Sequence, residues 1–364
     1  MMISTSVSIY TVKKVNATVS SSLLDANAWK TREQILANWS TLETTYPNLV
    51  SHEVFGKTFE GRDMLVYFIG DKNKAIFMID GATHGQEVSG SELCYYYAKW
   101  ILERNDPVLS QTVLTNSCIM IVPIVNVDGY KTHRKNMDLI GWNGSGSFAN
   151  YGVDLNRNFD WHWDYGNATT GGGVSSDPVN ANYKGPSANS EPETKAYISL
   201  WNRYTPKHYL NNHAFGNQII WKADTKYVTD SEQKTEDDQV FQSVYNEYVQ
   251  LTSEWGNTAI HLSTDGGTGN FGMSPYYYHR TYSWSNEIVL SQTSIAYSTL
   301  LPQLMNQWFP FYITLNLASC GARILDITTI VITIMIGIMI PIVMIIAYSK
   351  RGYIRKIKSL KLRW

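Results

Sequence analysis

Residues 74–90, with the sequence KAIFMIDGATHGQEVSG, place a polar turn directly after a run of apolar residues. The run Ala75–Ile79 predicts a buried strand, because strands covered on both faces are apolar throughout. A helical pattern follows from about Val88 to Arg104. The turn between them carries His84 and Glu87, and side chains three positions apart in such a turn point the same way. The stretch therefore predicts an α/β unit with polar groups gathered at the end of a strand.

The same alternation of strands and helices extends along the chain. The pattern predicts helices at 29–48, 190–204, 236–255 and 301–318, a hairpin at 49–70, and strands at 118–129, 207–213 and 282–290. Ser190 and Glu193 match a capping box at the start of the second of these helices. Strands alternating with helices predict an α/β layer fold, whose sites lie at the strand ends.

The composition indicates a globular protein. The chain has 364 residues, of which 44% are hydrophobic and 13% aromatic, enough for a sizeable core. Its formal net charge of −1 gives no general attraction to nucleic acid, so we expect no nucleic-acid partner. The three cysteines are far apart and odd in number, which predicts free thiols rather than a disulfide framework or a thiolate metal site: Cys94, Cys118 and Cys320.

Further polar side chains lie where sites are expected. His213 ends a predicted strand, and Glu287 lies in an apolar strand, where an unpaired carboxylate would be costly. Asn156 and Arg157 stand side by side in the Gly- and Asn-rich segment 141–186. Such long irregular segments are usually functional, and an amide beside a guanidinium can hold a carboxylate.

A catalytic zinc ion needs about three protein ligands from His, Glu or Asp, with one position left for water. His84 and Glu87 supply two ligands, and His213 offers a third. Each also has a simpler interpretation, since an H-x-x-E pair occurs in many surface loops and a lone strand histidine is more often packed in a core. The residues alone leave these alternatives open.

Taken together and in this order, the pieces resemble the zinc metallocarboxypeptidase family typified by carboxypeptidase A, over roughly residues 28–319. The lead-in at 46–64 and the helix start at 189–196 are part of the resemblance. It implies a three-layer α/β/α fold, with helices on both sides of a mixed, mostly parallel eight-stranded sheet. It also implies one Zn²⁺ ion per chain.

The resemblance assigns roles to eight residues. Glu287 matches the general base and acid, and Arg134 matches the arginine that stabilises the oxyanion. Asn156 and Arg157 match the pair that holds the terminal carboxylate of the substrate, and Asp154 falls where the family keeps a carboxylate behind the first histidine. The implied activity is removal of a C-terminal residue from peptides or proteins. The zinc ligands fall at three positions: His84, Glu87 and His213.

The sequence departs from the family pattern at the substrate side. Gln86 stands where the family commonly has an arginine for binding substrate further upstream. No tyrosine precedes the Gly-Gly step at 266–267, where the family's mobile tyrosine lies, and the tyrosines at 276–278 come later. The residue that sets the preferred C-terminal side chain is left open among Asp265, Gly269 and Asn270.

Two other functions fit the same residues. A related zinc amidase would act on cell-wall peptides or on acidic side-chain tails with the same metal site. A non-catalytic surface protein would keep the fold and bind a partner.

The C-terminal part of the chain predicts a membrane anchor. No charged residue occurs from Ile327 to Tyr348, a length close to the roughly 20 residues that cross a bilayer as a helix. A basic tail follows at 349–364, so the positive-inside rule places it in the cytoplasm and the preceding domain outside the cell. The N-terminus shows no clear export signal. We expect a flexible leader at 1–27, a catalytic domain at 28–319 and a transmembrane helix at 324–348, as a single-pass membrane protein that contacts the lipid bilayer.

Overall fold

The fold was analysed in a computed structural model of the chain. The structure describes residues 28–130, 152–161, 163, 174–178, 180, 182–214, 216–221, 231–254, 258–260, 262–263, 274–288 and 296–321, together with strands at 9–10 and 323–324. The chain forms two compact units, one of residues 1–13 and 323–364 and one of residues 14–322. In the first unit, β1 (Ile9–Tyr10) pairs in parallel with β10 (Arg323–Ile324).

In the described part of the second unit, eight strands form one mixed sheet in the order β2-β3-β5-β4-β6-β9-β7-β8. The pairings β4–β5, β4–β6, β6–β9 and β7–β8 are parallel, and the other three are antiparallel. The expected mixed, mostly parallel sheet is therefore present. The strands are β2 (Val50–Lys57), β3 (Asp63–Ile69), β4 (Ala75–Gly81), β5 (Ser117–Val122), β6 (His208–His213), β7 (Gln218–Trp221), β8 (Leu262–Ser263) and β9 (Tyr282–Glu287).

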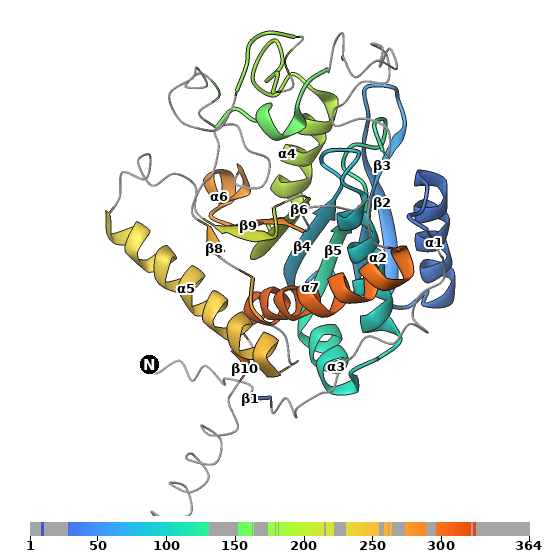
Figure 1. The fold of residues 1–364 in the computed structure, drawn as a ribbon, viewed down its shortest axis with the longest axis vertical. Helices are drawn as coiled ribbons and strands as arrows, with labels where there is room; N and C mark the ends of the chain where they lie inside the picture. Colours follow the sequence, from blue (N-terminus) through green and yellow to red (C-terminus); the bar gives the residue numbers. More distant parts are fainter. Residues whose placement is uncertain are drawn as a thin grey trace, which may run out of the picture. The chain divides into compact units, whose positions relative to one another are not determined.

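Helices cover both faces of this sheet, which makes the three expected layers (Figure 1). On one face, Tyr197 and Trp201 of α4 pack with Met78 of β4 and Met120 of β5 in the main hydrophobic cluster. On the other face, Trp39 of α1 stacks on Tyr67 of β3 with ring centroids 4.6 Å apart. The helices are α1 (Arg32–Thr45), α2 (Val88–Leu102), α3 (Pro107–Asn116), α4 (Pro192–Tyr204), α5 (Ser231–Glu254), α6 (Ser274–His279) and α7 (Tyr297–Ser319).

The predicted capping box at Ser190 and Glu193 is wrong. Helix α4 begins at Pro192, and its N-cap is Glu191, which makes no side-chain capping bond. The Ser190 hydroxyl donates to Glu191 Oε1 at 2.7 Å, and Glu193 Oε1 accepts from the Phe59 backbone N–H at 2.9 Å. Glu193 therefore ties α4 to the turn after β2. A capping box does start α1, where Thr31 and Gln34 bond reciprocally.

Two glycines bring β4 and α2 into close contact. A Cβ atom added to Gly81 would lie 2.5 Å from the Gly90 carbonyl carbon and 2.5 Å from the Ser91 nitrogen, both backbone atoms. Real Cβ atoms do not approach backbone so closely, so the contact requires glycine at position 81. This contact fixes the start of α2, and with it Glu87, against the end of β4.

No helix in the described part of the chain is long and apolar enough to span a membrane. The predicted transmembrane stretch beyond Ile324, the basic tail at 349–364 and all of the predicted leader except β1 lie outside the described residues. The three expectations for these segments stay predictions.

We expect Gly81→Ala to lower the free energy of unfolding by about 1–3 kcal/mol, because the added methyl group forces α2 away from β4. The shift would also move Glu87, one of the predicted metal ligands, so the variant should hold less zinc than the wild type after both are incubated with it. Urea unfolding and metal analysis measure the two effects. Gly61→Ala is the control for zinc content, since its Cβ would meet no atom within 4 Å: it should lose stability through backbone strain at a φ of 83° but keep wild-type zinc content. Wild-type stability and zinc content in Gly81→Ala would contradict the prediction.

Candidate metal centre

The parallel strands bring the predicted site residues to one edge of the sheet. His84 and Glu87 lie in the turn that follows β4, and Glu87 is the residue directly before α2. His213 is the last residue of β6 and pairs in register with Glu287, the last residue of β9. Because β4, β6 and β9 are neighbours and run in the same direction, their carboxyl ends meet.

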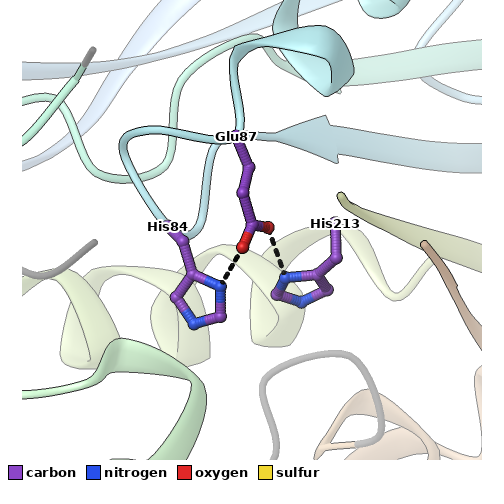
Figure 2. Close-up of side chains that lie close together, drawn as sticks. All are labelled: His84, Glu87 and His213. Carbon is purple, nitrogen blue, oxygen red and sulfur yellow. Dashed lines mark hydrogen bonds and ion pairs between the residues drawn. The ribbon is translucent and has the colours of Figure 1, made fainter. Parts of the chain in front are cut away.

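His84, Glu87 and His213 form a compact buried cluster. Their ligand atoms lie within 4.8 Å of one another, and each residue is at most 4% exposed. The Glu87 carboxylate lies between the two rings, with Oε1 2.8 Å from His84 Nδ1 and Oε2 3.1 Å from His213 Nδ1 (Figure 2). The Ala214 backbone N–H also donates to Oε2 at 3.0 Å. The three side chains thus aim their coordinating atoms at one another.

Asp154 contacts the ring nitrogen of His84 that points away from Glu87. It is fully buried, and its Oδ1 lies 3.1 Å from His84 Nε2. The same oxygen accepts the Asn156 backbone N–H at 3.0 Å, so Asp154 also caps the short 3-10 helix Leu155–Arg157. A metal-binding histidine usually donates its second ring nitrogen to such a carboxylate, which fixes the ring. Asp154 lies where it could accept this bond from His84, and its role at a bound metal stays a prediction.

The ionisable groups of the cluster shift one another's pKa values. Burial alone would lower the pKa of His84, but the carboxylates of Glu87 and Asp154 outweigh burial and raise it to about 9. Burial would raise the pKa of Glu87, but the neighbouring imidazoles lower it to about 2. A positive charge is therefore favoured between these groups, and a metal cation would supply it with release of a proton.

The donor set fits zinc. Two imidazole nitrogens and a carboxylate oxygen are the ligands that zinc takes in catalytic sites, with a fourth position for water. The buried cluster supplies these atoms from three points in the chain, and Asp154 orients one ring. His84, Glu87 and His213 would hold the ion.

Glu287 lies beside this cluster at the end of β9. It is half-buried, next to His213 in the sheet. Gly216 lies against it, because a Cβ atom at Gly216 would lie 2.5 Å from Glu287 Cβ. The chain thus leaves room for a carboxylate that is near the metal ligands but more accessible than they are.

The predicted substrate residues lie on the same side. The Asn156 amide nitrogen lies 3.4 Å from His213 Nε2, so the 3-10 helix approaches the cluster directly. Arg157 is half-buried, and its Nη1 donates to the Asn156 carbonyl at 2.8 Å. Its Nε is buried with no hydrogen-bond partner within the described part of the chain, which leaves a donor for a ligand. Arg134, Asp265, Gly269 and Asn270 lie outside the described residues.

Two of the tyrosines after the Gly-Gly step, Tyr276 and Tyr278, make contacts away from the metal cluster. The Tyr276 hydroxyl donates to Asp237 at 2.5 Å, and the ring is buried. Tyr278 packs against Trp201 on the α4 face of the sheet, with ring centroids 6.3 Å apart. Neither contact belongs to the metal cluster.

The sequence analysis missed a buried polar network directly beneath the site. Asp80, fully buried in β4, accepts from the Tyr209 hydroxyl at 2.5 Å, the Tyr197 hydroxyl at 3.1 Å and the Asn211 amide at 2.7 Å. Asn211 also donates to Thr83 Oγ1 at 2.8 Å, next to His84. Burial raises the pKa of Asp80 to about 6, against the opposing effect of these hydrogen bonds. The only signal in the sequence was an acidic residue at the end of an apolar strand.

Comparison with known proteins gives a consistent result. Residues 35–316 match the family model described as zinc carboxypeptidase. Among curated proteins, carboxypeptidase A6 of Mus musculus is 29% identical over 202 residues, and carboxypeptidase B of Rattus norvegicus is 30% identical over 207 residues. The matched segments cover 52% and 54% of this chain but only 43% and 46% of those relatives. The chain therefore spans less than half the length of these two relatives.

Solved structures share the fold. Carboxypeptidase A from Helicoverpa armigera superposes with a TM-score of 0.63 at 22% identity, covering 83% of this chain and 76% of that one. Bovine thrombin-activatable fibrinolysis inhibitor, solved with tick carboxypeptidase inhibitor, gives a TM-score of 0.63 at 21% identity, covering 81% and 97%. At these identities the likeness shows the fold alone.

We expect Asp154→Asn to weaken zinc binding about 10- to 100-fold, because the amide is a poorer acceptor for the His84 ring and no longer adds negative charge. Competition with a chromophoric chelator measures the affinity. Asp160→Asn, an exposed change in the same segment, is the matched control and should leave zinc affinity unchanged. Equal affinities for Asp154→Asn and the wild type would show that Asp154 does not act on the metal.

Proposed function

Because this chain belongs to the zinc carboxypeptidase family, we propose that it is a zinc-dependent carboxypeptidase that removes a C-terminal residue from peptides or proteins. One observation carries the proposal: the buried cluster of His84, Glu87 and His213 lies beside the half-buried Glu287 in the sheet. A metal site with an adjacent carboxylate is the arrangement that hydrolysis of a peptide bond requires.

The chain's own residues divide the chemistry between them. When bound, zinc would lower the pKa of a coordinated water towards about 7 and polarise a carbonyl group. Glu287 would accept the proton from the attacking water and pass it to the leaving amine. Arg134 would stabilise the negative oxygen that develops on the carbonyl, by the resemblance stated above. Glu287 suits the role of general base because it lies near the metal ligands but is not itself a ligand.

Asn156 and Arg157 would determine which peptide bond is cut, by holding the C-terminal carboxylate of the substrate. A guanidinium binds a carboxylate with paired, charge-assisted hydrogen bonds, and the unpartnered Nε of Arg157 supplies one such donor. A free C-terminus held there would present only the last peptide bond to the metal. This positioning makes the proposed activity an exopeptidase activity.

We also propose that residues 324–348 anchor the protein in a membrane, with the tail at 349–364 in the cytoplasm and the catalytic domain outside the cell. The uncharged run from Ile327 to Tyr348 and the basic residues after it support this proposal. Protease treatment of intact cells tests it. The domain should be digested while an epitope on the tail survives, and the reverse pattern would place the domain inside.

Removal of zinc by dialysis against a chelator should abolish release of a C-terminal amino acid, and added zinc should restore it. Glu287→Gln should retain zinc, because Glu287 is not in the ligand cluster, but lose about 100- to 10,000-fold in kcat. Product release from a blocked dipeptide measures the rate, and metal analysis confirms loading. A non-catalytic binding protein would show no turnover even when loaded with zinc. Full turnover in Glu287→Gln would place the base elsewhere.

A peptide with a free C-terminus and its amidated form should differ sharply as substrates. The wild type should prefer the free acid, because only the carboxylate pairs with Arg157, and Arg157→Lys should raise KM for the free acid about tenfold or more. The preference should shrink in the variant. Equal cleavage of both peptides by the wild type would favour the amidase alternative.

A further inference from the structure

A cavity lies at the opposite end of the strands from the metal centre. Its volume is about 620 Å³, within the range of ligand sites. It is lined at the start of β4 by Ala75 and Ile76 and at the start of β6 by Pro206 and Lys207. The metal cluster lies at the other ends of these two strands, roughly 20 Å away along seven residues of β4. The cavity is therefore separate from the metal centre.

The lining of this cavity is strongly basic. Five of its residues carry permanent positive charges and come from different parts of the chain: Lys72, Lys74, Arg203, Lys207 and Arg280. Two carboxylates pair with members of this set. Glu53 contacts Lys72 at 2.6 Å and Arg203 at 3.3 Å, and Asp237 contacts Arg280 at 2.6 Å. The exposed Asp71 lies near Lys74 and hydrogen-bonds to Asn73. The positive charges outnumber these carboxylates.

Two of the lysines are not matched by a carboxylate contact in the described part of the chain. The Lys74 ammonium donates to the Thr115 carbonyl at 2.6 Å, and the Lys207 ammonium lies 5.2 Å from the centre of the Tyr282 ring. Neither partner cancels a charge. The cavity thus offers a ligand two ammonium groups, those of Lys74 and Lys207.

Hydrogen bonds to the backbone hold the segments that line the cavity. The Lys207 N–H donates to the Ile76 carbonyl at 2.8 Å, and the Tyr282 N–H donates to the Lys207 carbonyl at 3.1 Å. The Thr281 hydroxyl donates to the Pro206 carbonyl at 2.8 Å. Arg280 adopts a φ of 56°, a left-handed conformation that usually takes glycine or asparagine. The bases of several lining side chains are therefore held in place.

We propose that this cavity binds an anion that carries more than one phosphate group. Several cations converging on one hollow favour a ligand with several negative charges, and a phosphate oxygen accepts well from both ammonium and guanidinium groups. The volume exceeds that of a single phosphate ion, which leaves room for a phosphorylated organic group. The inference does not depend on the proposed peptidase activity, because no lining residue belongs to the metal centre.

Such a ligand has two sources, a phospholipid headgroup or a soluble phosphorylated molecule. Ser319, the last residue of α7, lines the cavity, and the uncharged run 327–348 follows it closely in the sequence. Because that run is proposed as a membrane anchor, a phospholipid is one of the two ligands to test. The test below separates the two sources.

Binding is measured on the full-length protein in neutral detergent by calorimetric titration with dioctanoyl phosphatidylinositol 4,5-bisphosphate, as a phospholipid, and with inositol 1,4,5-trisphosphate, as a soluble phosphorylated molecule. The double variant Lys74→Gln and Lys207→Gln should weaken binding by about 100-fold or more, because it removes two charged hydrogen bonds that each contribute about tenfold or more to affinity. Binding should also weaken as salt is added. Lys195→Gln is the matched control, since its ammonium likewise donates to a backbone carbonyl, that of Ser190, outside the cavity.

Tighter binding of the phospholipid than of the trisphosphate, lost in the double variant and kept in the control, supports a membrane lipid as the ligand. Equal or tighter binding of the soluble trisphosphate, with the same dependence, supports a soluble ligand. No binding of either anion, or equal binding by the wild type and the double variant, overturns the proposal. Lys207→Gln alone repeats the test if the double variant does not fold. Release of a C-terminal amino acid is measured on each variant, so loss of the peptidase is distinguished from loss of the anion site.

Discussion

The Glu87 carboxylate, held between two imidazole rings, is the contact on which the candidate site depends. A buried carboxylate is costly unless positive charge and hydrogen bonds meet it, and here His84, His213 and the Ala214 N–H do so. The contact requires α2 to start immediately above β4. It also requires β6 to end beside β4. The Gly81–Gly90 approach and the parallel pairing of β4 with β6 supply these two conditions. The active groups are therefore fixed by the sheet and its first crossover helix rather than by loops alone.

The sheet also separates the two sites that the chain presents. The parallel strands β4, β6 and β9 have their carboxyl ends on the same side of the sheet. His84, His213 and Glu287 therefore lie together there. The amino ends of β4 and β6 lie on the opposite side, and the residues around them include several lysines and arginines. One end of the strands thus combines acids and imidazoles that would hold a metal cation, and the other end places lysine and arginine side chains around a cavity. The charge of the whole chain is close to neutral, which hides this division.

The sequence was sufficient to predict the features that depend on local pattern and chemistry. Apolar runs predicted β4 and β5, and the residues at the strand ends made His84, Glu87 and His213 candidate metal ligands, which the family resemblance then assigned to zinc. Features that depend on distant partners were not predictable. Asp80 is recognisable only once Tyr197 and Tyr209 are beside it, and the basic cavity draws on residues scattered from Lys72 to Arg280. Helix α3 was missed although Asp106 and Pro107 mark its start, and β7 has only four residues, too few for a clear alternation.

Glu87 has a second structural role, because it is also the N-cap residue of α2. An N-cap side chain normally accepts a hydrogen bond from the first turn, and losing that bond costs about 1 kcal/mol. Glu87 makes no such bond, because its oxygens are committed to the two histidines and Ala214. The helix is therefore less stable than its sequence could allow, and a serine or aspartate at position 87 would start it better while removing a ligand. Selection for thermal robustness and selection for turnover would pull this single position in opposite directions.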